Sequence, residues 1–173
     1  QDGRYLQSNC SAYELLFCDL QDGKQVKSAS ELKDMNWATW TCTLGWPVQG
    51  IWSNGMDGSD INAVARSHTG HLLATSDDFG KVHLFRYPCI KENSVSLNYS
   101  GHSSHVMNVR WTAGDECLIS CGGNDKTVMQ WKHVMTPPDR SEDALVGHHD
   151  SSMKELGLED STLSLLEGPA AGD

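Results

Sequence analysis

A repeat of about 45 residues constrains the fold of this chain more than any other feature of its sequence. Two stretches match when they are laid in register, and in each of them short apolar runs alternate with turns that contain Gly, Asp or Asn. Such runs are typical of β-strands, and this spacing is that of four-stranded sheets repeated around an axis. The matched runs are 61–66, 72–75 and 82–85 in the first stretch, and 106–111, 118–121 and 128–131 in the second.

A partial third copy precedes the two full ones. It spans residues 5–8 and 14–19 and lacks an innermost strand. No window ahead of the C-terminal tail has a long 3.6-residue apolar period, so the body of the chain is expected to be all-β. Residues 135–138 (MTPP) cannot continue a strand, which leaves the last copy without an outermost strand. We therefore expect about three sheets in an incomplete ring, since a closed ring needs four or more.

Charge divides the chain into a body, residues 1–135, and an acidic tail, residues 136–173. The tail has nine acidic and two basic residues, which is −7 of the formal net charge of −10 and leaves −3 for the body. Its richness in Ser, Asp, Glu and Gly predicts a mostly disordered segment. Its apolar residues could still form a short amphipathic turn or two on a partner. These residues are Met153, Leu156, Leu158, Leu163, Leu165 and Leu166.

Several classes of location and partner are disfavoured by composition. No apolar run reaches the roughly 18 residues of a transmembrane helix. The chain begins Gln1-Asp2-Gly3, without an apolar signal segment, so export is not expected. The six cysteines form no C-x-x-C pair, which favours buried free thiols over a disulfide framework. Neither body nor tail has the basic face that nucleic acid or an anionic membrane would need.

The second full copy carries the sharpest short motif. Gly101-His102, later Asp125, and then Trp131-Lys132 resemble the WD repeat, whose blades begin near Gly-His and end near Trp-Asp. The resemblance implies a propeller blade stitched by hydrogen bonds that run from His102 to a strand hydroxyl, to Trp131 and to Asp125. The hydroxyl position is expected to fall on Cys121, a weak hydrogen-bonding group, so the network is expected to be incomplete.

Longer motifs are more specific. They are residues 37–45 (WATWTCTLG), 48–52 (VQGIW), 57–64 (DGSDINAV), 77–89 (DDFGKVHLFRYPC) and 101–106 (GHSSHV). Together they resemble the echinoderm microtubule-associated protein-like family over most of residues 1–133. The resemblance implies the closing blades of the second of two joined propellers, in a cytoplasmic scaffold of the microtubule cytoskeleton. It implies tubulin and other proteins as partners, no enzymatic activity, no cofactor, and a need for the rest of the propeller to close the ring.

A cluster of tryptophans leaves two interpretations open. Trp37, Trp40, Trp46 and Trp52 lie in an unusual connection between the first and second copies. Aromatic residues at a surface often anchor partners, so the cluster is a possible partner surface. The alternative is a hydrophobic cover over a non-standard blade, and we favour this alternative.

Metal sites are not expected. Residues 54–60 (NGMDGSD) have the Asp and Gly of a calcium loop, but no Glu stands at the twelfth position from any plausible start. The pairs His68/His71 and His148/His149 lack a third ligand. A turn that leads into a strand explains the loop equally well.

Two other functions remain as alternatives to a microtubule-associated scaffold. One is a propeller that recruits other proteins, such as a substrate adaptor of a ubiquitin ligase, with no microtubule role. The other is an enzyme built on a propeller, which would need clustered polar residues where the inner strands begin. Asp60 and His105 alone are too few for this, and no phosphate loop or nucleophile elbow is present.

Overall fold

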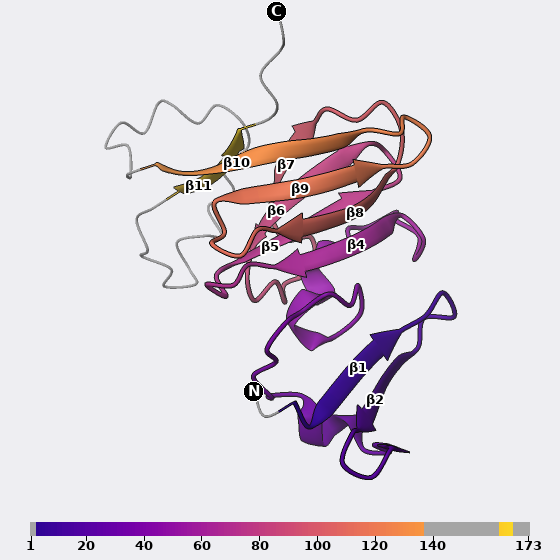
Figure 1. The fold of residues 1–173 in the computed structure, drawn as a ribbon. Coiled ribbons are helices and arrows are strands. Elements are labelled where there is room, and N and C mark those ends of the chain that lie inside the picture. The colour runs from indigo at the N-terminus through magenta and orange to yellow at the C-terminus, as the bar shows by residue number, and fades with distance from the viewer. Residues whose placement is uncertain (1–2, 137–162, 168–173) are drawn as a thin grey trace, which may run out of the picture.

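Strands dominate the described part of the chain, and they follow the apolar runs of the sequence. The computed structural model describes residues 3–136 and 163–167 (Figure 1). Its strands form three antiparallel sheets: β1 (Tyr5–Asn9), β2 (Leu15–Asp19) and β3 (Lys24–Gln25); β4 (Ile61–Arg66), β5 (Leu72–Asp77), β6 (Lys81–Arg86) and β7 (Leu97–Ser100); and β8 (Val106–Trp111), β9 (Cys117–Gly122), β10 (Val128–Thr136) and β11 (Leu163–Glu167). The predicted all-β fold, a partial propeller of three blades, is confirmed.

The two full blades repeat one another in detail. In each blade the first strand pairs with the second and the second with the third, in antiparallel hairpins. The register shifts once in each first strand, between Ile61 and Ala63 in β4 and between Val106 and Asn108 in β8. These irregularities lie at matching positions of the sequence repeat. The repeat therefore encodes the irregularity as well as the strands.

Two hydrophobic cores lie on the two faces of the middle blade. Side chains alternate between the faces of a strand, so Leu72 and Ala74 enter the core shared with the last blade, while Leu73 enters the core shared with the first. All six residues of β5 are buried for this reason. The second core also contains the connection that carries the 3₁₀ helices η1 (Ala29–Leu32) and η2 (Trp46–Ile51). The middle blade is thus held between its neighbours.

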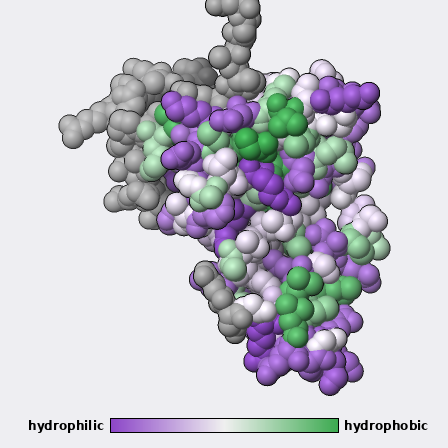
Figure 2. All heavy atoms as spheres, in the orientation of Figure 1, coloured by the Kyte–Doolittle hydropathy of each residue, from purple (hydrophilic) through white to green (hydrophobic). Residues whose placement is uncertain are grey.

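The outer blades each expose apolar side chains. Leu6, Leu16 and Leu20 of the first blade are between 39% and 55% exposed. In the last blade, Met107 is 51% exposed and Val128 is 71% exposed. Figure 2 shows apolar side chains gathered over β1 and β2, and again over the last blade. These are the faces on which further blades of a ring would pack. Within the described residues, no helix is long and apolar enough to cross a membrane.

The edge of the last blade differs from the expectation. The prediction that this blade lacks an outermost strand is wrong, because β11 pairs with β10 over five positions, from Lys132 opposite Glu167 to Thr136 opposite Leu163. The amphipathic turn expected around Leu163, Leu165 and Leu166 is wrong as well, since this backbone is a strand. Met153, Leu156 and Leu158 lie outside the described residues, as does most of the tail that was predicted to be disordered.

Candidate functional site

A buried chain of hydrogen bonds links the strands of the last blade. His102 lies just before β8, and its side chain is fully buried. Its Nδ1 is 2.8 Å from Asp125 Oδ2, and its Nε2 is 2.7 Å from Ser120 Oγ. Trp131 Nε1 donates to the same Ser120 oxygen over 2.8 Å.

One assignment of protons satisfies all of these groups. Because a carboxylate only accepts, His102 Nδ1 carries the proton and donates to Asp125. The Nε2 atom then accepts from the Ser120 hydroxyl, whose oxygen accepts from the Trp131 indole. The chain runs from Trp131 to Asp125 with every member paired, which is the condition under which a buried polar network stabilises a fold.

The hydroxyl of this network is on Ser120, and the expectation of Cys121 is wrong. Cross-strand partners share a face of the sheet, and Leu118 stands opposite Trp131. Ser120, two residues beyond Leu118 on the same strand, faces the same core, whereas Cys121 faces the other side. Ser120 is fully buried. The alternation from Leu118 to Ser120 was the signal in the sequence that could have located the hydroxyl.

Replacing Ser120 with alanine is expected to lower the free energy of unfolding by about 1–3 kcal/mol. The substitution leaves Trp131 Nε1 without an acceptor and His102 Nε2 without a donor inside the core. The matched control is Cys121→Ser, which adds a hydroxyl on the other face and should change the free energy by less than about 0.5 kcal/mol. Urea unfolding followed by far-ultraviolet circular dichroism measures both. A larger loss of unfolding free energy for Cys121→Ser than for Ser120→Ala would contradict the assignment of the network's hydroxyl to Ser120.

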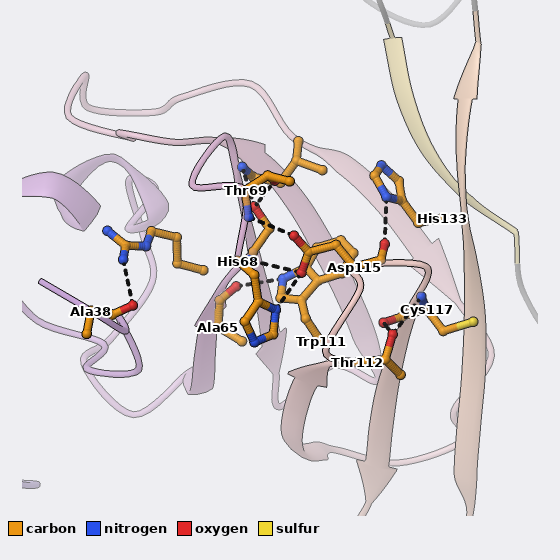
Figure 3. Close-up of polar contacts among 12 residues, drawn as sticks. Ala38, Ala65, His68, Thr69, Trp111, Thr112, Asp115, Cys117 and His133 are labelled. Atoms are coloured by element: carbon orange, nitrogen blue, oxygen red, sulfur yellow. Dashed lines mark hydrogen bonds and ion pairs between the residues drawn. The ribbon is translucent and has the colours of Figure 1, made fainter. Parts of the chain in front are cut away.

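A second polar centre joins the middle blade to the last one. Asp115, in the turn between β8 and β9, is 4% exposed. Its carboxylate accepts from the backbone N–H of His68 (2.9 Å) and of Thr69 (2.8 Å), and it lies 2.7 Å from His68 Nδ1 (Figure 3). Beside it, Trp111 Nε1 donates to the carbonyl oxygen of Ala65 over 3.0 Å. We call this set of contacts the blade seam.

The seam extends to both sides. His133 Nδ1 on β10 lies 2.8 Å from the backbone oxygen of Asp115. On the opposite face of the middle blade, Arg66 donates through Nη2 to the carbonyl oxygen of Ala38, over 3.0 Å. Figure 3 shows these contacts in one view, from the connection at Ala38 to β10. The blades are therefore held together by polar contacts as well as by their cores.

Acid should weaken the blade seam. Burial raises the pKa of Asp115, but hydrogen bonds from the backbone N–H groups of His68 and Thr69 outweigh it and hold the pKa below its ordinary value. A carboxyl whose pKa is lower in the folded state contributes its full stability at pH values above the unfolded-state pKa. That stability is lost as the pH falls through the folded-state pKa. We expect the urea concentration at the unfolding midpoint to decrease as the pH is lowered below about 4. The decrease should be less steep for Asp115→Asn. Equal pH profiles for the two proteins would contradict the role of this carboxylate.

A third cluster, which the sequence did not point to, links the strands of the middle blade. His83 on β6 has Nε2 2.8 Å from Asp77 Oδ2 and Nδ1 2.6 Å from Asn98 Oδ1. Asp77 is 3% exposed and ends β5, while Asn98 lies on β7. Three strands are thereby joined at one histidine. The middle blade carries Phe85 where the last blade has Trp131, so its polar contacts are built around a different residue.

The tryptophan cluster is mainly a hydrophobic cover. Trp37 is 9% exposed and Trp40 is 2% exposed, so the possible partner surface is wrong for these two residues. Trp46 and Trp52 are half-buried and pack against the same core. Phe17 stacks on Trp37 with ring centroids 5.7 Å apart. The alternative interpretation, a cover over a non-standard blade, agrees with this packing.

Among the described residues, chemistry-bearing side chains form no metal-binding group and do not gather at the hollow beside β1. Residues 3–136 and 163–167 contain no group of three or more His, Cys, Asp or Glu side chains that could hold a metal ion. A hollow of about 230 Å³ lies between β1 and residues 35–41, and its lining has no His, Cys, Asp or Glu. Asp60 and His105, weighed above as possible catalytic groups, bond locally: Asp60 Oδ2 accepts from the Asp57 N–H, and His105 Nδ1 lies 3.1 Å from Ser104 Oγ.

Comparison with known proteins identifies relatives of the body of the chain. Residues 1–133 match the family model described as the second β-propeller of echinoderm microtubule-associated protein. The chain is 51% identical over 134 residues to echinoderm microtubule-associated protein-like 4 of Xenopus tropicalis, which covers 77% of the chain and 14% of that protein. It is 52% identical over 134 residues to human echinoderm microtubule-associated protein-like 2, and the match covers 78% of the chain and 21% of the relative. It is 47% identical over 133 residues to human echinoderm microtubule-associated protein-like 3, and the match covers 76% of the chain and 15% of the relative. The chain thus spans only a small part of the length of the curated relatives it matches.

Proposed function

Because the chain belongs to the echinoderm microtubule-associated protein-like family, as part of the second propeller, we propose that it is a non-enzymatic, microtubule-associated scaffold. The observation that carries the proposal is identity of about half over 134 residues to proteins whose names state microtubule association. The proposed location is the cytoplasm, on the microtubule cytoskeleton. The proposed partners are tubulin and other proteins, with no role for nucleic acid or membranes.

The use of polar side chains supports a scaffold. His102, Asp125 and Ser120 are bound to one another, and Asp115 is bound to His68 and Thr69. An acid or base in catalysis must be free to bond a substrate, whereas these groups are occupied by the fold. Their arrangement holds strands and blades in fixed positions, which is what a binding platform needs.

The exposed faces support association with the rest of a propeller. Leu6 and Leu16 on one outer blade, and Met107 and Val128 on the other, stand where the next blades of a ring would pack. We propose that the remainder of the same propeller covers these faces. Partners such as tubulin would then bind at the loops and strand ends that a closed ring leaves accessible.

Co-sedimentation with stabilised microtubules tests the proposal. The 173-residue chain is centrifuged with microtubules and, as the control, alone at the same concentration. We expect a saturable fraction to pellet only with microtubules. A chain that stays in the supernatant in both tubes would contradict microtubule binding by these blades. In that case, capture of other proteins, such as ubiquitin-ligase subunits, would support the adaptor alternative.

A further inference from the structure

The outer edge of the last blade is occupied by a strand from outside the family match. The match ends at residue 133, whereas β11 spans Leu163–Glu167. Figure 1 shows β11 beside β10, at the edge of the sheet furthest from β8. The family match therefore does not account for this strand, and we explain its contacts from this chain.

Leu166 anchors β11 in the core. It is 4% exposed and belongs to the same hydrophobic cluster as Trp131, Leu118 and Val82. Its backbone N–H donates to the Tyr99 hydroxyl over 2.9 Å. Tyr99 lies on β7 of the neighbouring blade, so the contact joins the tail to two blades at once. A strand resting on the edge through backbone bonds alone would need neither contact.

The position of β11 also differs from that of the outer strand of the middle blade. There β7 pairs with β6 from Lys81 to Leu84. The matching residues of the last blade are 127–130, at the start of β10, whereas β11 pairs with Lys132–Thr136. β11 is thus the outer strand of the last blade, but it pairs further along the third strand than β7 does in the middle blade.

We propose that the outer edge of β10 at Lys132–Thr136, together with the Tyr99 hydroxyl, is a strand-docking site. Its occupant is the chain's own segment Leu163–Glu167. The site recognises an extended segment by its backbone, as in strand addition, and by one apolar side chain at the position of Leu166. Occupancy from the same chain covers an edge that would otherwise pair with other chains. This inference stands apart from microtubule binding.

A peptide competition tests the site. Leu166→Asp in the full chain places a charge in the hydrophobic core that holds Leu166 and should release the segment. A labelled peptide with the sequence of residues 160–170 should then bind this variant saturably and leave the wild-type chain unbound. The same peptide with aspartate at the Leu166 position should bind neither. Adding Tyr99→Phe to the Leu166→Asp chain should weaken binding by roughly 2- to 10-fold, the effect of one hydrogen bond.

The result that overturns the proposal is equal binding of the peptide to the wild-type and Leu166→Asp chains, or binding to neither. Hydrogen exchange of the wild-type chain supplies a measurement that needs no variant. The amides of Leu163–Glu167 should be protected at low protein concentration. Protection that is absent, or that appears only as a dimer forms, would overturn occupancy by the chain's own segment.

Discussion

Replacing Trp131 with alanine is expected to lower the free energy of unfolding by about 3–5 kcal/mol. Trp131 is 2% exposed and packs against Tyr99 with their ring centroids 6.0 Å apart. Its Nε1 donates to the Ser120 hydroxyl oxygen. The substitution therefore opens a cavity between two blades and leaves the Ser120–His102 pair without its indole donor. Because the net stability of a domain is about 5–15 kcal/mol, a loss of this size should shift the urea midpoint strongly or abolish cooperative unfolding.

The matched control for this change is Trp131→Phe. Phenylalanine keeps most of the apolar surface and loses the Nε1 donor, and the middle blade has Phe85 at the same position of the repeat. Its cost should be smaller, about 1–3 kcal/mol. Circular dichroism serves for both, since the chain contains five other tryptophans that complicate fluorescence. A cost below about 1 kcal/mol for alanine would contradict the central place of Trp131 in the core.

Replacing Asp115 with alanine is expected to cost about 3 kcal/mol, because backbone donors of His68 and Thr69 lose a buried charged acceptor. Part of the loss has another origin. Asp115 has φ +56, in the left-handed region, which alanine tolerates less well than aspartate. Asp115→Gly also removes the carboxylate, but glycine adopts the left-handed backbone without a penalty. The difference between the two variants therefore measures the backbone penalty of alanine. If glycine restores the wild-type midpoint in urea, the hydrogen bonds of the blade seam contribute little, and the account of the seam is wrong.

Much of the fold could be predicted because it depends on local periodicity. The apolar runs of the repeat placed β4–β6 and β8–β10, and the WD-like spacing brought His102, Asp125 and Trp131 to notice. The error at Cys121 came from matching the motif by position instead of by face. In a strand of period two, a shift of one residue moves a side chain to the other side of the sheet.

The blade seam and β11 could not be predicted for a different reason. Asp115 contacts His68 across 47 residues of sequence, and no motif marks an aspartate in a turn as the acceptor for the turn of another blade. The run from Leu163 to Glu167 is short and has four apolar or small residues in five, so periodicity alone cannot separate strand from helical turn. Its pairing is decided by the open edge of β10, which is a tertiary property.

The most direct test of the microtubule-associated scaffold is the affinity of the chain for stabilised microtubules at about 50 mM and about 200 mM salt. The body carries −3 of the net charge and the tail −7, so attraction to an acidic partner surface cannot drive binding. We expect saturable binding whose dissociation constant changes by less than about threefold between the two salt concentrations, because binding would depend on shape and apolar contacts. Absence of microtubule binding at both salt concentrations would contradict the proposed microtubule-associated function.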